Sequence, residues 1–79
     1  MIKLNILNME RFLETVNGCT GRVNMLCPDG RKQNINKRYW IQDQLRARSA
    51  ENHDSLRLTL EIPGAEDYMK IVYYYVGEY

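Results

Sequence analysis

The segment Leu56-Arg57-Leu58-Thr59-Leu60-Glu61-Ile62 alternates strictly between apolar and polar side chains. This period of two is that of a β-strand with one buried and one solvated face. Pro63 and Gly64 follow directly and are typical of a strand end. A strand that is apolar on one face predicts a sheet covered by helices on that face and open to water on the other.

The start of the chain has the same pattern and then changes period. Within residues 2–7, Ile2, Leu4 and Ile6 alternate with polar residues, which predicts a second one-sided strand. Asn8 is a suitable helix cap, and Asn17-Gly18 ends the predicted helix because glycine accepts a left-handed conformation. The apolar residues of that helix are spaced at i, i+3, i+4 and i+7, namely Met9, Phe12, Leu13 and Val16.

The next two segments predict a hairpin. Residues 22–27 return to period two, with Val23, Met25 and Cys27 on one face. The Pro28-Asp29-Gly30 turn combines a fixed φ, a side chain that bonds its own backbone and a residue that tolerates positive φ. The partner strand, residues 31–35, is so polar that we expect it at the edge of the sheet.

Two further helices complete the predicted order β-α-β-β-α-β-α. Asn36 is a plausible cap for a helix over residues 37–48, and Ser49–Ser55 is expected to be a polar loop. Glu66 and Asp67 suit the positive end of a final helix. The expected buried face of that helix consists of Tyr68, Ile71, Val72 and Tyr75. The tyrosines at 73, 74 and 79 are expected to be partly exposed.

Composition narrows the class of protein. With 79 residues and a net charge of +1, the chain predicts one α+β domain over residues 1–79 that is not a polyelectrolyte. The absence of a long apolar run or a signal pattern predicts a cytoplasmic protein with no membrane contact. Cys19 and Cys27 are too few for a disulfide scaffold, and together with His53 they have the wrong number and spacing for zinc. We therefore expect free thiols and no metal or cofactor.

The chain resembles the HPr family, the histidine phosphocarriers of the bacterial phosphotransferase system. The resemblance covers nearly the whole chain. It is carried by segments that are weak singly but occur in the family's order, namely Phe12-Leu13-Glu14-Thr15-Val16, Arg22-Val23-Asn24-Met25-Leu26, Gly30-Arg31-Lys32, Asn34-Ile35-Asn36-Lys37, strand 56–62 and the acidic start of the last helix. The resemblance implies an open-faced β-sandwich, with a four-stranded antiparallel sheet in the order 1-4-2-3 and three helices on one face.

The departures from HPr concern its chemistry. In the family, a loop after the first strand carries the phosphorylated histidine, followed by an arginine and a proline. Here Leu7-Asn8-Met9 leads directly from strand to helix, and the sole histidine, His53, is far along the chain. The position of the regulatory serine found in many family members falls on Lys37, and the nearest serine is Ser49. The sequence therefore resembles a degenerate HPr without phosphotransfer activity.

Other catalytic constellations are equally weak. His53-Asp54-Ser55 contains the residue types of a catalytic triad, but adjacent residues on one loop do not supply the converging geometry. Glu66 and Asp67 are neighbours, and neighbouring residues on a helix point in different directions. No glycine-rich phosphate loop is present, because Gly18 and Gly21 are not followed by a lysine-bearing motif. We therefore expect no enzymatic activity.

The charge distribution points to binding. Residues 31–48 hold six basic residues against the single acid Asp43, whereas residues 51–79 hold two basic residues against six acids. The candidate partner-binding surface is Arg31, Lys32, Lys37, Arg38, Tyr39, Trp40, Arg46 and Arg48. Three interpretations stay open for it: a solvated surface, a dock for an acidic protein partner, and a surface for RNA or single-stranded nucleic acid. The tyrosine run at 73–75 is either part of the core or a contact in a homodimer.

Overall fold

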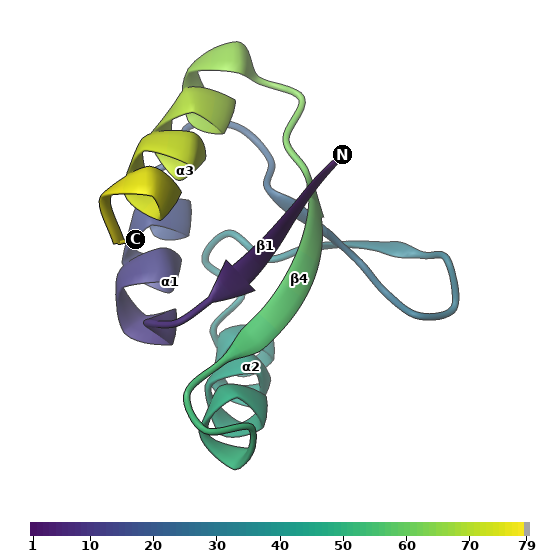
Figure 1. The fold of residues 1–79 in the computed structure, drawn as a ribbon. Helices are drawn as coiled ribbons and strands as arrows, with labels where there is room; N and C mark the ends of the chain where they lie inside the picture. Colours follow the sequence, from purple (N-terminus) through teal and green to yellow (C-terminus); the bar gives the residue numbers. More distant parts are fainter. Residues whose placement is uncertain (79) are drawn as a thin grey trace.

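The computed structural model describes residues 1–78 and has the predicted α+β architecture. The four strands form one antiparallel sheet in the order β1-β4-β2-β3 (Figure 1). The elements in chain order are β1 (Ile2–Ile6), α1 (Met9–Asn17), β2 (Asn24–Leu26), β3 (Lys32–Asn34), α2 (Tyr39–Glu51), β4 (Leu56–Glu61) and α3 (Ala65–Glu78). Within the described chain, no helix is long and apolar enough to cross a membrane.

Strands β1 and β4 form the longest strand pair of the sheet. They pair along their whole common length, from Ile2 opposite Leu60 to Ile6 opposite Leu56. Because side chains alternate across a strand, this register directs the apolar residues of both strands to the same face. There they meet the three helices in one buried core, which includes Phe12 of α1, Leu45 of α2 and Ile71 of α3.

Helix α1 confirms the predicted cap and buried face. The Asn8 side chain accepts a hydrogen bond from the Arg11 backbone N–H at 3.2 Å, and all four predicted apolar residues are buried. The helix ends at Asn17 as expected, but the predicted left-handed glycine is wrong. Gly18 has φ −83° and donates its N–H to the carbonyls of Glu14 and Thr15, each at 3.1 Å.

The hairpin is shorter than predicted. Asp29 accepts from the Arg31 N–H at 3.0 Å and Gly30 has φ +86°, so the turn forms as the sequence indicates. β3 lies at the sheet edge, as expected. β2 covers three residues instead of 22–27, because the N–H of Val23 bonds to the Asn36 side chain and that of Cys27 bonds to Arg31 within the turn. The hairpin projects away from the helices (Figure 1).

The second helix differs from the prediction at both ends. It begins at Tyr39 and continues to Glu51, so part of the expected loop at 49–55 is helical. Asn36 does not cap it. Arg38 occupies the cap position and makes no side-chain cap hydrogen bond. The side chain of Asn36 instead donates to the Val16 carbonyl.

The buried face of α3 is rotated from the predicted one. Of the four residues predicted to be buried, only Ile71 is fully buried; Val72 and Tyr75 are half-buried and Tyr68 is exposed. Asp67 is buried in its place at 3% exposure. Tyr74 is half-buried, with its ring centroid 6.0 Å from that of Phe12. Tyr79 lies outside the described residues.

Candidate functional site

The amino end of α1 is where an HPr-type phosphorylation site would lie. A shallow pocket of about 360 Å³ there is lined by Asn8, Glu10, Arg46 and Asp54 among others, and not by His53. Arg46 pairs with Glu10 at 2.5 Å, so its charge is already balanced. His53 is exposed in the turn after α2 at φ +58°, and no hydrogen bond or ion pair to it is present within residues 1–78. The structure thus places no imidazole at this pocket.

The six cations of residues 31–48 do not form one patch. Arg31 lies 3.6 Å from Asp29 in the hairpin turn, and Lys32 bonds to Glu61 across the sheet. Arg46 bridges Glu10 and Asp43. Three of the six predicted cations are therefore already paired with acids, which reduces their attraction for a charged partner.

Lys37, Arg38 and Arg48 remain, and the fold brings Arg22 beside the first two. Arg22, Lys37 and Arg38 line a shallow depression of about 310 Å³ between the loop after α1 and the start of α2. Their side chains are exposed, and among the described residues no acid pairs with them. The sequence analysis missed Arg22, because only the folded loop brings it beside residues fifteen positions later.

Two exposed aromatic residues directly follow Arg38 in the first turn of α2. Tyr39 and Trp40 are each 62% exposed. The first turn of α2 contains no acidic residue. Cations at the positive end of a helix are electrostatically unfavourable, and acids are the usual choice there. We call the set Arg22, Lys37, Arg38, Tyr39 and Trp40 the basic–aromatic surface.

A network of half-buried side-chain amides holds this surface in place. Asn36 accepts from the Val23 N–H at 2.6 Å and donates to the carbonyls of Val16 at 3.1 Å and Gly21 at 2.9 Å. Asn17 accepts from the Lys37 N–H at 2.7 Å. Lys37 is held at φ +54°, a conformation that is unfavourable for a residue with a Cβ atom. The hydrogen bond from the Lys37 N–H to Asn17 therefore helps to hold Lys37 in this strained conformation, at the point where Lys37 and Arg38 are exposed to solvent.

Asp67 fixes the other side of the same loop. Its carboxylate accepts from the backbone N–H groups of Thr20 at 3.0 Å and Gly21 at 2.6 Å, which lower the pKa of the carboxyl group. A side chain at position 21 would displace the Asp67 carboxylate, because a Cβ atom there would lie 2.8 Å from the Asp67 Oδ2 atom. Asp67 thus stabilises the loop that carries Arg22, a role beyond the helix-end electrostatics that its sequence position indicates.

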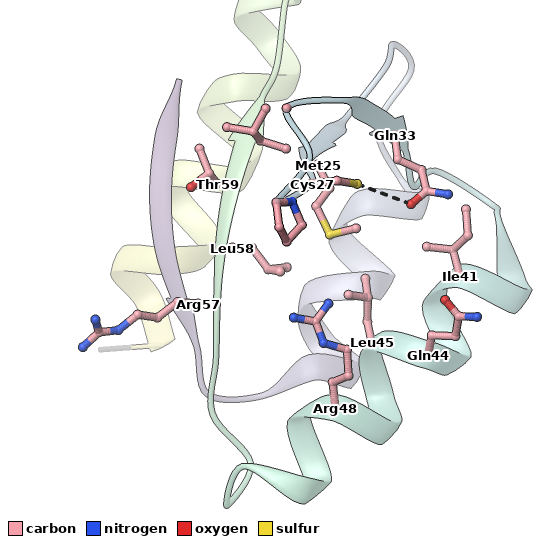
Figure 2. A pocket seen from close by; sticks show the side chains of 13 residues that line it. Met25, Cys27, Gln33, Ile41, Gln44, Leu45, Arg48, Arg57, Leu58 and Thr59 are labelled. Atoms are coloured by element: carbon pink, nitrogen blue, oxygen red, sulfur yellow. Dashed lines mark hydrogen bonds between the residues drawn. The ribbon is translucent and has the colours of Figure 1, made fainter.

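The last predicted residue, Arg48, lies apart from this surface. Arg48 is on the last turn of α2 and points into a cleft of about 520 Å³ between α2, the β2–β3 hairpin and β4, which we call the hairpin cleft (Figure 2). The predicted surface of eight residues therefore separates into the basic–aromatic surface, a set of paired cations and one cation in a cleft.

The cysteines show no arrangement for catalysis or metal binding. Burial raises the pKa of the Cys19 thiol, and the nearby charge of Asp67 adds to this effect, so the thiol is protonated at neutral pH. Cys27 is half-buried in the hairpin cleft, and both cysteines are free. In the part of the chain that the structure describes, no three His, Cys, Asp or Glu side chains cluster as metal ligands would.

Tyr73 is the most exposed of the described tyrosines, at 70%, whereas Tyr74 and Tyr75 are half-buried. The Tyr74 hydroxyl donates to the Asn8 carbonyl at 3.1 Å, and the Tyr75 hydroxyl accepts from the Asn5 N–H at 3.3 Å. Two of the three tyrosines are thus part of the fold, and Tyr73 remains as a surface aromatic.

Comparisons of the chain with models of known protein families, with curated proteins and with solved structures found no match.

Proposed function

We propose that the protein is a non-catalytic, HPr-like binding module that docks an acidic protein partner through its basic–aromatic surface. The observation that carries this proposal is that Trp40, 62% exposed, lies in the first turn of α2, two residues after the exposed cation Arg38, which occupies the cap position without a side-chain hydrogen bond. Covering a large exposed apolar side chain is favourable, and acidic groups on the partner would offset the cost of removing water from Arg38.

The residue types fit a protein interface. Trp, Tyr and Arg are the residues that most often dominate the binding energy of protein complexes. The unpaired charges of Arg22, Lys37 and Arg38 would speed the encounter with an acidic surface, and the aromatic rings would supply the buried area. The amide network around Asn36 supports this role, because a preorganised backbone lowers the entropy lost on binding.

The absence of phosphotransfer activity is part of the proposal. It is supported by the lack of an imidazole at the amino end of α1 and by the exposed position of His53 in another turn. Incubation with phosphotransferase enzyme I and phosphoenolpyruvate should leave the protein unlabelled. Label that disappears in His53→Ala would contradict this part of the proposal.

A comparative affinity capture tests the binding surface. Tagged wild type, Trp40→Ala and Arg38→Gln are incubated with nuclease-treated lysate of the host, and captured proteins are quantified by mass spectrometry. The matched control is Arg57→Gln, which removes another exposed cation, from the opposite face of the sheet. We expect an acidic protein that is enriched by wild type and by the control but is reduced at least about 10-fold by Trp40→Ala, as for a central interface residue.

Binding measurements with the purified captured protein then test whether the basic–aromatic surface is the docking site. Its affinity should weaken with both surface variants, and Arg38→Gln should also lower the association rate constant and its dependence on salt. If every captured protein is bound equally well by wild type and by Trp40→Ala, the basic–aromatic surface is not the docking site.

Nucleic acid is the second candidate, because cations beside exposed aromatic rings also suit stacked bases. It predicts that a fluorescent single-stranded oligonucleotide binds at low salt and is released steeply as salt rises. Trp40→Ala would then reduce binding through lost stacking. Oligonucleotide binding with these properties, together with capture of nucleic acid and no acidic protein, would replace our proposal by this one.

A further inference from the structure

The hairpin cleft exists because the sheet divides beyond its second pair of residues. β2 pairs with β4 only at Asn24 opposite Glu61 and Met25 opposite Leu60. After Met25 the hairpin leaves β4, and helix α2 forms the opposite wall. The cleft between them therefore has an apolar floor, on which Met25, Leu45 and Leu58 converge (Figure 2).

Arg48, whose side chain is exposed to solvent, lies at the edge of this cleft. The guanidinium group of Arg48 is directed from α2 toward β4 and the hairpin, whereas Arg57 also lines the cleft but its guanidinium group points away from it (Figure 2). Arg48 makes no hydrogen bond or ion pair within residues 1–78, and none of the residues that line the cleft is acidic. Its position in the last turn suits the helix dipole, but that effect does not require the side chain to point into the cleft.

We propose that the hairpin cleft binds a small organic carboxylate with an apolar chain. The carboxylate pairs with Arg48, since a guanidinium group matches two carboxylate oxygens in a bidentate contact. The chain packs on Met25, Leu45 and Leu58. The volume of about 520 Å³ is within the range of small-molecule sites, roughly 300–1,000 Å³. This site is separate from the basic–aromatic surface and does not depend on the function proposed above.

Three probes separate the contributions of charge and chain. The full-length ¹⁵N-labelled protein is titrated with octanoate, 1-octanol and acetate, and amide chemical shifts are followed. Octanoate should shift the amides of Met25, Leu45 and Leu58 saturably. Octanol, which lacks the charge, should bind about 10-fold or more weakly, as expected for a lost charge-assisted hydrogen bond. Acetate, which lacks the chain, should cause no saturable shift in the cleft.

Two variants test whether Arg48 is the cation that binds the carboxylate. Arg48→Gln should reduce octanoate affinity to that of octanol, while its unliganded spectrum stays that of a folded protein. Arg38→Gln removes an equally unpaired cation outside the cleft and should leave octanoate binding unchanged.

The site is refuted if octanoate causes no saturable shift, if octanol binds as tightly as octanoate, or if the shifts lie outside the cleft. An extended acidic peptide is the competing occupant, because residues 56–59 of β4 have no strand partner on the side of β2. Shifts along β4 with such a peptide and none with octanoate would also overturn our assignment.

Discussion

Asn17 and Gln42 exchange two hydrogen bonds between the end of α1 and the first turns of α2. Gln42 donates from Nε2 to the Asn17 Oδ1 atom at 2.7 Å, and Asn17 donates from Nδ2 to the Gln42 Oε1 atom at 3.2 Å. Gln42 is fully buried at 0% exposure and also donates to the Ile35 carbonyl at 2.8 Å. The same Asn17 oxygen accepts from the Lys37 N–H, so this pair links the core to the basic–aromatic surface.

We predict that Gln42→Leu lowers the free energy of unfolding by about 1–3 kcal/mol, because buried polar partners lose their hydrogen bonds without a large change in volume. Gln44→Leu on the same helix is the control and should change it by less than about 0.5 kcal/mol, since Gln44 is exposed. Urea unfolding measures both values. Hydrogen exchange at the Lys37 amide should also accelerate in Gln42→Leu. Equal losses in the two variants would contradict the role of the pair.

Asp67 predicts an acid-sensitive fold. The two backbone donors lower its pKa in the folded protein below the unfolded value of about 3.9. The ionised carboxylate therefore stabilises the fold fully above the unfolded pKa, and this contribution is lost as the pH falls through the lower, folded pKa. Urea unfolding between neutral pH and pH 2.5 should show stability declining across this window.

The variant Asp67→Asn should be less stable than wild type at neutral pH and should show a smaller decline in acid. In asparagine an NH2 group, which only donates, replaces one of the two carboxylate oxygens, so the hydrogen bond from either Thr20 or Gly21 is lost. Glu66→Gln changes the adjacent, exposed acid and should retain the wild-type pH profile. Part of the decline should persist in Asp67→Asn, because hydrogen bonds from Lys32 and Asn24 also lower the pKa of Glu61. An unchanged decline in Asp67→Asn would refute the assignment.

The fold could be predicted from sequence where the signal is local. Alternation in the segments around Leu4 and Leu58, the cap at Asn8 and the turn at Asp29 each depend on residues close in the chain. The strand order 1-4-2-3 came from the resemblance to HPr, and the structure has the same order.

The errors concern polar residues whose partners are distant in the chain. Asn36 has the composition of a helix cap, but its side chain bonds to residues 13 to 20 positions earlier. Asp67 has the position of a helix-start acid, yet its partners lie 46 and 47 residues away. The local sequence pattern does not predict hydrogen bonds between residues that are distant in the chain. For the same reason the charge block at 31–48 was treated as one surface, although half of its cations have acidic partners in the fold.

The cap of α1 provides a test of a local prediction. Asn8→Ala removes the acceptor for the Arg11 N–H but retains the backbone carbonyl that accepts from Tyr74. We expect it to cost about 0.5–2 kcal/mol of unfolding free energy, as is typical of cap removal. Asn8→Asp keeps the acceptor and places a negative charge at the positive helix end, so it should be neutral or stabilising. Thermal unfolding distinguishes the two, and equal melting temperatures would contradict the cap.

Trp40 reports the electrostatics of the basic–aromatic surface. It is the sole tryptophan of the chain, so indole fluorescence arises from this position alone. Because the side chain is 62% exposed, we expect the emission maximum of a solvated indole and efficient quenching by neutral acrylamide. Lys37 and Arg38 should attract iodide and repel caesium, so iodide should be the stronger of the two ionic quenchers relative to free tryptophan.

This preference should weaken as sodium chloride rises to about 0.5 M, because charges on a solvated surface are screened. The double variant Lys37→Gln/Arg38→Gln should bring the two quenching constants closer together at low salt, whereas Arg57→Gln should leave them at their wild-type values. Equal quenching by iodide and caesium in the wild-type protein would mean that these cations create no positive potential at Trp40. The proposed electrostatic contribution of Lys37 and Arg38 to partner binding would then be refuted, even if the indole itself still contributed to binding.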